Sequence, residues 1–356
     1  MRAAAIAFLF PALSLAASAR CLGANGEPLD WWFAYKNHGG TDYAFVSSAA
    51  PPSPGPLRLT GLALDAAGSP LLRTLQQVVD GRSSLARVAW NDELPAAAWG
   101  GNASGASGTS GHTKGVLAAG AGGGFFLSHT LPKFPDLTGA GIWGGASSIY
   151  GQNFLCLTLD AANADAVALS MQFGDPRAYD SAVPAGLSAA LPNTVALVAG
   201  QRRAGTRATQ LRTVGGAALT QYVKSGSTGV DIYEDVLQPA VASDMLVETW
   251  LRSPVMGTYC RPDYAWASIN VRGLLFVDAR GANATWKETQ DHSKLAISAP
   301  PDRFQVATPN LVCAGDMNRM TSQWARGGGT TCMVHPSLWA ALANTFAVAD
   351  QDCGPV

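Results

Sequence analysis

The sequence of 356 residues is poor in histidine and lysine, since it contains five histidines and six lysines. It lacks an HExxH motif, an EF-hand loop and a GxSxG elbow, which excludes the usual zinc-protease, calcium-binding and serine-hydrolase sites. None of its cysteines stands in a CxxC pair, which argues against a zinc or dithiol redox centre. No metal and no cofactor are therefore predicted.

Long apolar runs are also missing, except at the N-terminus. Residues 3–13 form an apolar run behind Arg2, shorter than the roughly 20 residues that a membrane-spanning helix needs. Small residues follow at Ala17 and Ala19, which is the layout of a secretory signal peptide. We therefore expect residues 1–19 to be removed, and we expect no membrane contact afterwards.

The expected secretion indicates that the six cysteines form disulfides. An even set in a secreted chain predicts disulfides, although six cysteines allow 15 pairings and the residues alone do not choose among them. Two glycosylation sequons, at Asn102 and Asn283, suit the same route. The cysteines are Cys21, Cys156, Cys260, Cys313, Cys332 and Cys353.

The net charge of −1 gives little attraction for a polyanion at neutral pH. Histidine titrates near pH ~6.5, so protonation of all five would bring the formal charge from −1 to +4. In an acidic compartment the protein would be modestly cationic, so its net charge does not exclude a polyanionic partner there.

Apolar periodicity predicts a mixture of strands and helices. In the first half we expect a buried strand within residues 27–36, a helix ending near Gly81, a strand over residues 86–90, and two strands flanking the glycine-rich turn at 120–124. In the second half we expect a helix from about Asp231 and strands over residues 244–251 and 267–277, the latter leading into a loop. The alternation favours an α/β fold with a sheet in each half.

A three-residue pattern occurs once in each half. "GHTKG" contains His112 and Lys114, and "DHSKL" contains His292 and Lys294. In a chain with so few of either residue, two such pairs rarely arise by chance. Residues two apart on a strand point to the same side, so each lysine would accompany its histidine.

Two such pairs can perform phosphodiester chemistry without a metal. One neutral imidazole attacks phosphorus and forms a phosphohistidine, while the other, protonated, supplies a proton to the departing oxygen. The two ammonium groups stabilise the charge that develops on the phosphate oxygens.

These elements resemble those of the phospholipase D superfamily, and the surrounding sequence resembles the deoxyribonuclease II family. The matching stretches run in order through the whole mature chain. They are "DWWFAYK", "GHTKGVL", "FFLSHTLPKFP", "YGQNFLC", "DHSK", "VCAGDMNRM" and "RGGGTTC".

The resemblance implies a phospholipase D-like α/β fold with two related halves, over residues 20–190 and 191–356, and an active site at their junction. It implies a lysosomal or secreted acid endonuclease, monomeric or homodimeric, that cuts DNA without metal and leaves 3′-phosphate and 5′-hydroxyl ends. The implied catalytic residues are those of the two patterns, and the implied disulfides are 21–156, 260–353 and 313–332. The implied substrate-binding residues are His129, Asp316 and Asn318.

Several points stay open at this stage. Either pattern histidine could be the nucleophile, and Asp316 and Asn318 could instead cap a turn. The family commonly has an aspartate eight residues after the first histidine, where this chain has Gly120. Lys224 could contact DNA phosphate, but a solvated lysine is the simpler interpretation.

Alternative functions also remain at this stage. They are another phosphodiesterase of the superfamily, acting on lipid or RNA, and a non-catalytic nucleic-acid-binding relative. His38 and His335 lack basic partners and are expected to lie on the surface or to satisfy local backbone groups rather than to take part in catalysis.

Overall fold

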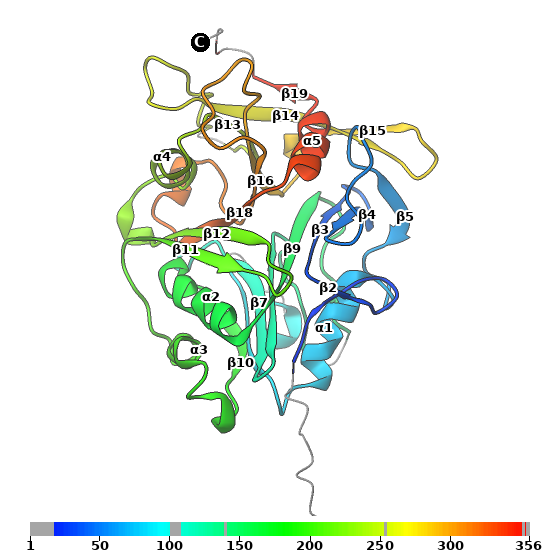
Figure 1. Cartoon of the computed structure of the whole chain (residues 1–356), viewed down its shortest axis with the longest axis vertical. Helices are drawn as coiled ribbons and strands as arrows, with labels where there is room; N and C mark the ends of the chain where they lie inside the picture. The colour runs from blue at the N-terminus through cyan, green and yellow to red at the C-terminus, as the bar shows by residue number, and fades with distance from the viewer. Residues whose placement is uncertain (1–17, 100–107, 139–140, 253–254, 351–352, 354–356) are drawn as a thin grey trace, which may run out of the picture.

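A computed structural model describes residues 18–99, 108–138, 141–252, 255–350 and 353. Two large sheets form the molecule, one mainly below and one mainly above the centre of Figure 1. Residues 1–17 of the expected signal peptide 1–19 and the sequon at Asn102 lie outside the described residues, so the signal peptide and the glycan both stay predictions. Among the described residues, no helix has the length and apolar character needed to cross a membrane.

The first sheet has eight strands, and every neighbouring pair in it is antiparallel. The helix α1 (Pro70–Asp80) covers its outer face and buries Leu71, Leu75 and Val78 there. A small two-stranded sheet, β1 (Cys21–Leu22) with β2 (Pro28–Leu29), lies beside it. In spatial order the eight strands are β10 (Ala178–Ala182), β6 (Ala86–Asn91), β7 (Lys114–Gly120), β8 (Gly123–His129), β9 (Gln152–Leu159), β3 (Trp31–Lys36), β4 (Asp42–Ser47) and β5 (Leu59–Ala63).

The second sheet has nine strands. Its pairs are antiparallel except for β13 with β14, and the short β19 (Val348–Ala349) pairs with β14 off the main path. The remaining order is β11 (Thr206–Arg212), β12 (Ala218–Lys224), β18 (Gly328–Val334), β17 (Leu311–Gly315), β16 (Lys294–Ser298), β13 (Met245–Thr249), β14 (Ser268–Val277) and β15 (Asn283–Lys287).

The main hydrophobic core lies between the two sheets. It joins side chains of the first sheet, such as Phe33 and Leu157, to side chains of the second, such as Ile297 and Phe276. The helices α2 (Ala161–Gly174) and α5 (Pro336–Thr345) contribute their apolar sides to this core. The helices α3 (Pro192–Val198) and α4 (Gln238–Val241) are shorter and lie nearer the surface. The halves are therefore packed through one shared core.

The same strand arrangement occurs in both sheets. The order β3–β9–β8–β7–β6 in the first corresponds to β12–β18–β17–β16–β13 in the second. The register corresponds as well, since Gly115 lies opposite Ser128 in one half and Leu295 opposite Ala314 in the other. The molecule thus has the two related halves of the predicted fold class. The division at residue 190 itself stays a prediction.

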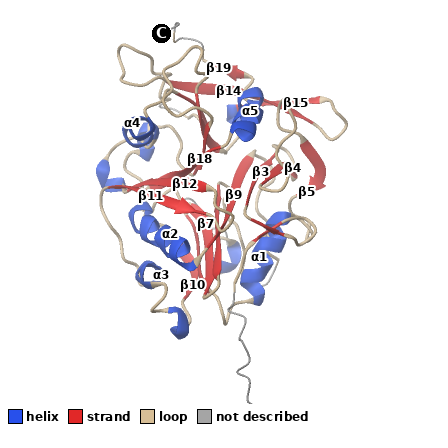
Figure 2. Cartoon of the chain, viewed as in Figure 1, coloured by secondary structure: helices blue, strands red, loops and turns tan. Residues whose placement is uncertain are grey.

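Most of the expected strands form. β3, the end of α1 at Asp80, β6 and the β7–β8 hairpin all lie where the sequence predicted them. The helix expected from Asp231 is short, a π-turn over Tyr233–Leu237 followed by α4. An extra strand, β15, stands between β14 and the second pattern, so β14 does not lead into that loop directly. Figure 2 shows that strands dominate and that regular alternation with helices is absent.

Three disulfides link the described cysteines. They are Cys21–Cys156, Cys260–Cys353 and Cys313–Cys332, the pairs that the family resemblance implies. The sequon residue Asn283 is exposed at the start of β15, where its glycosylation stays a prediction.

Candidate active site

The two His-x-Lys patterns occupy equivalent places in the two sheets. Lys114 is the first residue of β7 and Lys294 is the first residue of β16, so each histidine stands just before a central strand. Burial is the main cause that lowers the pKa values of both histidines, and electrostatic contributions cross between the patterns, from Lys114 to His292 and from Lys294 to His112. The patterns therefore act on each other at the junction of the halves.

A carboxylate connects the groups around the first pattern. Lys114 Nζ donates to Asp92 Oδ1, and Arg326 Nη2 donates to Asp92 Oδ2 at 3.0 Å. The Nε2 atom of His112 lies 4.0 Å from the same Oδ2. Burial alone would raise the pKa of Asp92, but Lys114, His112 and Arg326 hold it well below its usual value. Asp92 is therefore an anion between three basic groups.

The ring of His112 is held by the second half. Its Nδ1 atom is hydrogen-bonded to the main-chain carbonyl oxygen of Asp316, which follows β17. A carbonyl can only accept, so Nδ1 carries the proton and Nε2 is the atom available for proton transfer. Burial, Lys114, Lys294 and Arg326 keep the pKa of His112 well below its ordinary value, although Asp92 opposes them.

The surroundings of His292 are aromatic. Its ring stacks on Tyr150 with centroids 3.9 Å apart and lies 3.9 Å from the ring of Trp250. The buried Nε2 atom has no hydrogen-bond partner among the described residues. Burial and then Lys294 and Lys114 lower the pKa of His292 to about 2, as predicted for a histidine beside two lysines. This imidazole is neutral, and its Nε2 atom is uncommitted.

The difference between the two histidines follows from the register. Asn91, the last residue of β6, lies opposite Lys114 and is followed by Asp92. In the other half, Thr249, the last residue of β13, lies opposite Lys294 and is followed by Trp250. An acidic residue accompanies the first histidine where an aromatic residue accompanies the second. The symmetry of the fold is thus broken at the site.

The main-chain amides of the two histidines are bonded crosswise. His112 N donates to the carbonyl of Gly327 at 2.8 Å, and His292 N donates to the carbonyl of Gly151 at 2.9 Å. Gly327 immediately precedes β18 of the second half, and Gly151 immediately precedes β9 of the first half. A Cβ atom on Gly151 would lie 2.0 Å from Asp291 Oδ2, so this approach requires glycine.

A buried lysine organises the loop before each of these glycines. Lys36, at the end of β3, donates to the carbonyls of Asn37, Gly40 and Ser148. Lys224, at the end of β12, donates to three carbonyls of the loop before Gly327, those of Gln323, Trp324 and Arg326. The interpretation of Lys224 as a solvated lysine is therefore wrong, because its ammonium group is buried and fully used within the protein.

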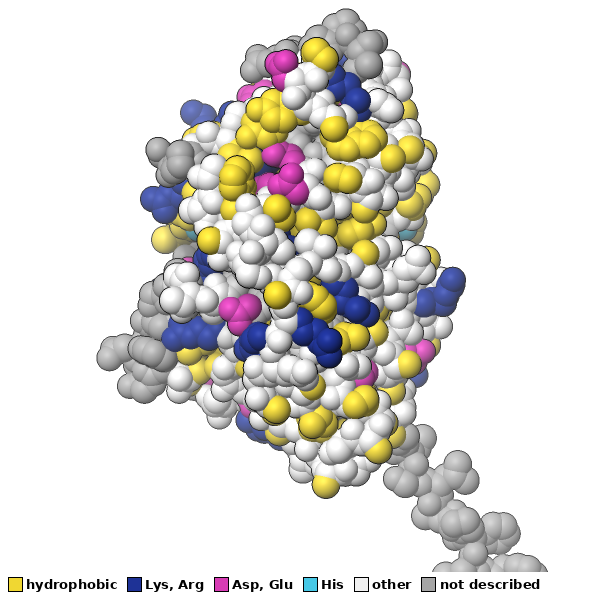
Figure 3. All heavy atoms as spheres, turned by 90° about the vertical axis from the view of Figure 1, so that its left-hand side faces the viewer, with side chains coloured by type: hydrophobic (Ala, Val, Ile, Leu, Met, Phe, Trp, Pro, Cys, Tyr) yellow, Lys and Arg dark blue, Asp and Glu magenta, His cyan; other side chains and the backbone are white. Residues whose placement is uncertain are grey.

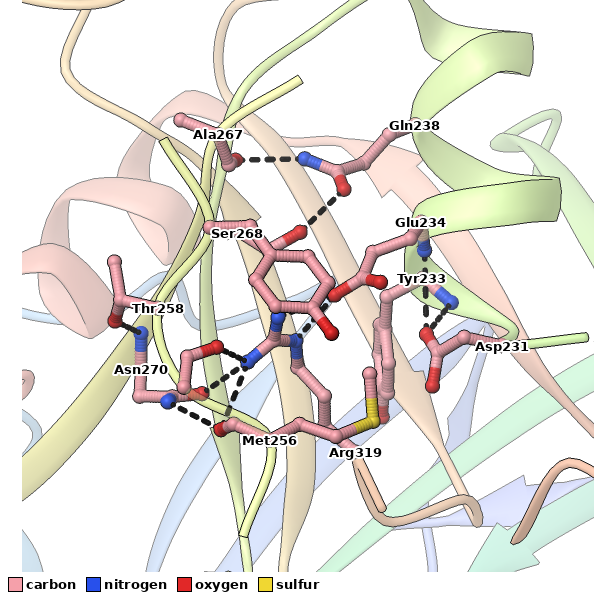
Figure 4. Close-up of polar contacts among 12 residues, drawn as sticks. Asp231, Tyr233, Glu234, Gln238, Met256, Thr258, Ala267, Ser268, Asn270 and Arg319 are labelled. Atoms are coloured by element: carbon pink, nitrogen blue, oxygen red, sulfur yellow. Dashed lines mark hydrogen bonds and ion pairs between the residues drawn. The ribbon is translucent and has the colours of Figure 1, made fainter. Parts of the chain in front are cut away.

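Three residues after Asp316, Arg319 centres a second ionic network, drawn in Figure 4. The fully buried Arg319 donates to Glu234 Oε1 through Nε at 2.8 Å and to Asn270 Oδ1 at 2.8 Å. Its guanidinium also donates to the carbonyls of Met256 and Gly257. The network fixes the chain next to Asn318, whose buried Oδ1 atom has no partner among the described residues.

The other residues named from the sequence are dispersed. His129 ends β8 with its ring edge-on to Phe134 and parallel to Phe154, in the core on the outer face of the first sheet. By register, Thr130 rather than His129 corresponds to Asp316, since Thr130 N donates to Asn153 O as Asp316 N donates to Gly329 O. His129 is thus brought near the aromatic core and not into contact with the histidine pair.

Two further histidines are structural, as expected. His335 caps α5 by accepting a hydrogen bond from Leu338 N, and its ring is edge-on to Trp31. His38 packs against the ring of Trp286.

Gly120 ends β7 at the hairpin, six residues beyond Lys114, so a side chain there could not support that lysine. Asp92 occupies the supporting place instead.

The charge expectation from composition needs correction. Burial lowers the pKa values of His112, His129, His292 and His335 in the folded chain. These histidines resist protonation, so acidification does not add one charge for each of the five. Two groups beside the histidine patterns titrate nearer neutrality: Lys294, whose pKa burial and Lys114 lower to about 7, and Asp316, whose pKa burial raises to about 7.

No group of three or more histidine, cysteine, aspartate or glutamate side chains in the described part of the chain could hold a metal ion. Positive charge at the site comes from Lys114, Lys294 and Arg326.

Two related sheets that meet at paired His-x-Lys elements define a phospholipase D-like α/β protein. The deoxyribonuclease II family model matches residues 20–352, and the chain belongs to that family. It is 29% identical to Deoxyribonuclease-2 of Caenorhabditis elegans, with 96% of each chain covered. It is 32% identical to a Putative deoxyribonuclease-2 of Burkholderia thailandensis, with 89% of each covered, and 29% identical to Deoxyribonuclease-2-alpha of Rattus norvegicus, with 91% of this chain and 92% of the relative covered.

The sequence did not point to Asp92, Trp250 or Arg326. Asp92 follows the predicted strand 86–90 by two residues, a place where a strand-end side chain often enters a site, and this was the available signal. Arg326 begins the quoted "RGGGTTC" stretch, but nothing in that stretch says that its side chain reaches the first half.

Proposed function

We propose that the protein is an acid endodeoxyribonuclease that hydrolyses DNA phosphodiesters without metal, through a phosphohistidine intermediate. The observation that carries the proposal is the pairing of two histidines with unlike surroundings. One is beside a carboxylate, and the other is neutral with a free Nε2 atom. Such a division suits one acid–base group and one nucleophile.

In the first step, His292 Nε2 attacks phosphorus and the bond to the 5′ oxygen breaks. His112 Nε2, protonated in the substrate complex, transfers its proton to that oxygen and releases a 5′-hydroxyl end. The other DNA fragment keeps the phosphate on its 3′ oxygen and is bonded to His292 through phosphorus and nitrogen, as a phosphohistidine. The anionic phosphate and Asp92 both favour the protonated form of His112, which the free enzyme disfavours.

In the second step, His112 takes a proton from water as the water oxygen attacks phosphorus. The phosphorus–nitrogen bond breaks, and a 3′-phosphate end leaves while His292 regains its lone pair. His112 is then protonated for the next turnover, so protons and bonds balance over the cycle.

The charged groups explain a preference for acid. Below about pH 7 Lys294 is an ammonium ion and the Asp316 carboxyl is neutral, so the pocket is more positive. As the pH rises through 7, the site loses the Lys294 charge and gains a negative charge on Asp316. Both changes weaken the stabilisation of a phosphate transition state. Asn318, with its unpaired buried Oδ1, is the remaining proposed contributor to substrate binding, whereas the burial of His129 against Phe134 and Phe154 does not favour such a role for it.

The remaining features agree with a lysosomal or secreted enzyme. Three disulfides suit an oxidising compartment. We include in the proposal a cleaved signal peptide, glycans at Asn102 and Asn283, and a division of the chain into residues 20–190 and 191–356. A monomer or a homodimer is compatible with it.

Nicking of supercoiled plasmid DNA at pH ~5 in excess chelator tests the proposal, because the two histidines need protons but no metal. We expect nicked circles with 3′-phosphate ends, which block polymerase extension until a phosphatase is added. A strict requirement for Mg²⁺ would reject the mechanism. Binding without nicking would identify a non-catalytic relative.

A further inference from the structure

The chain contains a long segment without acidic residues. From residue 181 to residue 230 there is no aspartate or glutamate, while Arg202, Arg203, Arg207, Arg212 and Lys224 all lie in it. The whole chain has a net charge of −1, so positive charge is concentrated in this part. Lys224 is buried, as described above, which leaves the four arginines for the surface.

These four arginines, which we call the arginine surface, follow one edge of the second sheet. Arg202 and Arg203 precede the edge strand β11, and Arg207 and Arg212 lie within it. Arg202, Arg203 and Arg212 are exposed and Arg207 is half-buried. Figure 3 shows this side of the molecule, with a row of basic side chains across its middle and few acidic ones among them.

Neutral partners hold most of the guanidinium groups without cancelling their charge. Arg203 donates to Gln172 Oε1, Arg207 donates to Thr209 Oγ1, and Arg212 donates to the carbonyl of Gly216. Among the ion pairs of the described residues, Arg202 alone of the four meets a carboxylate, that of Asp175 at 2.6 Å. Three positive charges are therefore uncompensated along this edge.

The arginine surface begins at the candidate active site. Arg202 is paired with Asp175, whose carbonyl accepts a hydrogen bond from Gly111 N, next to His112. The first residue of β11, Thr206, lies opposite Lys224, which bonds to the Arg326 carbonyl, whereas Arg212 lies opposite Ala218 at the far end. β11 therefore leads away from the site.

The spacing suits a DNA backbone. Arg207 and Arg212 are five residues apart, about 17 Å along the strand, and project to opposite faces of the edge strand, with the half-buried Arg207 beside the Phe173 ring and Arg212 exposed. One DNA strand has a phosphate about every 3.4 Å along the helix axis, so this distance spans about five phosphates. Guanidinium groups bind phosphate oxygens through paired N–H donors.

We propose that the arginine surface binds phosphates of the DNA several nucleotides away from the scissile bond. The proposal rests on the proposed nuclease function and adds to it a substrate class, namely DNA long enough to reach from the histidine pair along β11. Because the contacts are to phosphates, they confer affinity without sequence preference.

The test compares two triple variants with the same change in charge. The first is Arg203→Gln, Arg207→Gln, Arg212→Gln, which omits Arg202 because its ion pair supports the chain before His112. The control is Arg58→Gln, Arg280→Gln, Arg303→Gln, three exposed arginines outside the arginine surface. Equal thermal unfolding midpoints would show that both variants are folded.

Binding of a fluorescein-labelled 30-base-pair duplex at pH ~5 is measured by anisotropy at several salt concentrations. Each phosphate contact contributes about 0.9 to the slope of log K against log salt, so we expect the first variant to lose up to about 2.7 in slope. We expect its KM for the duplex to rise roughly tenfold at low salt, and its KM for a tetranucleotide to change much less. The control variant should keep the wild-type slope.

An unchanged slope in the first variant, or an equal loss in the control, would overturn the proposal. An equal KM change for duplex and tetranucleotide would also overturn it, because the contacts would then be at the scissile phosphate. Since binding is read without cleavage, a protein that binds with the expected slopes but never nicks DNA would refute the proposed nuclease function alone.

Discussion

The Nδ1 atom of His112 is hydrogen-bonded to the main-chain carbonyl of Asp316, a residue 204 positions later in the chain. This contact fixes the ring orientation and the tautomer of His112 from the other half of the molecule. It presents Nε2 toward Asp92, at 4.0 Å from its carboxylate. The structure therefore distinguishes an acid–base histidine from the neutral His292.

The two roles can be separated with an activated leaving group. His112→Ala should slow DNA cleavage by about 10²–10⁴-fold, because no group remains to protonate the 5′ oxygen. The same variant should still release nitrophenolate rapidly in the first turnover of the 4-nitrophenyl ester of thymidine 3′-phosphate, since nitrophenolate leaves without a proton, while the second step, which needs His112 as a base, stays slow. His292→Ala should lose this first turnover as well as DNA cleavage. The reverse pattern, measured as the nitrophenolate burst and as single-turnover cleavage of DNA, would exchange the two assignments.

The pH profile should depend on Lys294. Its pKa is lowered to about 7, so its positive charge is present below that pH and is lost above it. Lys294→Arg should be less active at pH 5, because a guanidinium differs in shape, but it stays charged and should decline less steeply between pH 5 and 8. The exposed Lys287→Arg serves as control and should keep the wild-type profile. Parallel declines in all three proteins would show that Lys294 does not set the alkaline limb.

The buried lysines should act on opposite histidines. Lys224→Met removes the donor to three carbonyls before Gly327, the acceptor for His112 N, and should cost about 3 kcal/mol of unfolding free energy. Its remaining activity should show the leaving-group dependence of His112→Ala, while Lys36→Met should resemble His292→Ala. Lys224→Arg should recover part of kcat. Identical leaving-group behaviour in both methionine variants would contradict crosswise positioning.

The Arg319–Glu234 pair should be important for stability. Burial raises the pKa of Glu234 to about 7 even beside Arg319, so the test is made at pH ~8. There Arg319→Met leaves Glu234 without its cation and should lower the free energy of unfolding by about 3–5 kcal/mol, measured in urea. The double variant Arg319→Met, Glu234→Leu should regain part of this loss, because no uncompensated charge remains. A double variant less stable than the single one would show that Glu234 stabilises the fold apart from its pair with Arg319, since both variants lack the bonds from Arg319 to Asn270 and Gly257.

Local pattern was sufficient for much of the fold. The apolar run that became β3, the helix ending before Gly81 and the glycine-rich β7–β8 turn all carry short-range signals. The strand β15 was missed, because the five residues 283–287 include three alternating exposed positions and no strong apolar run. Propensity likewise did not reveal that the segment after Asp231 forms a π-turn.

The site was predictable in its chemistry but not in its asymmetry. The repeated pattern identified both histidines and both lysines. The contrast between Asp92 and Trp250 depends on strand register across sheets, and the glycine acceptors depend on how the halves pack. Contacts of this kind join residues far apart in sequence, so no local signal marks them.

Each catalytic-site histidine donates a main-chain hydrogen bond to a glycine of the other half, and these two hydrogen bonds determine how the chain can be divided. A cut between α3 and β11 would separate two pieces, each holding one imidazole whose main-chain amide lacks its acceptor. Neither piece would then be a working half-enzyme. Activity would return when the fragments reassemble, at a rate that rises with the concentration of both.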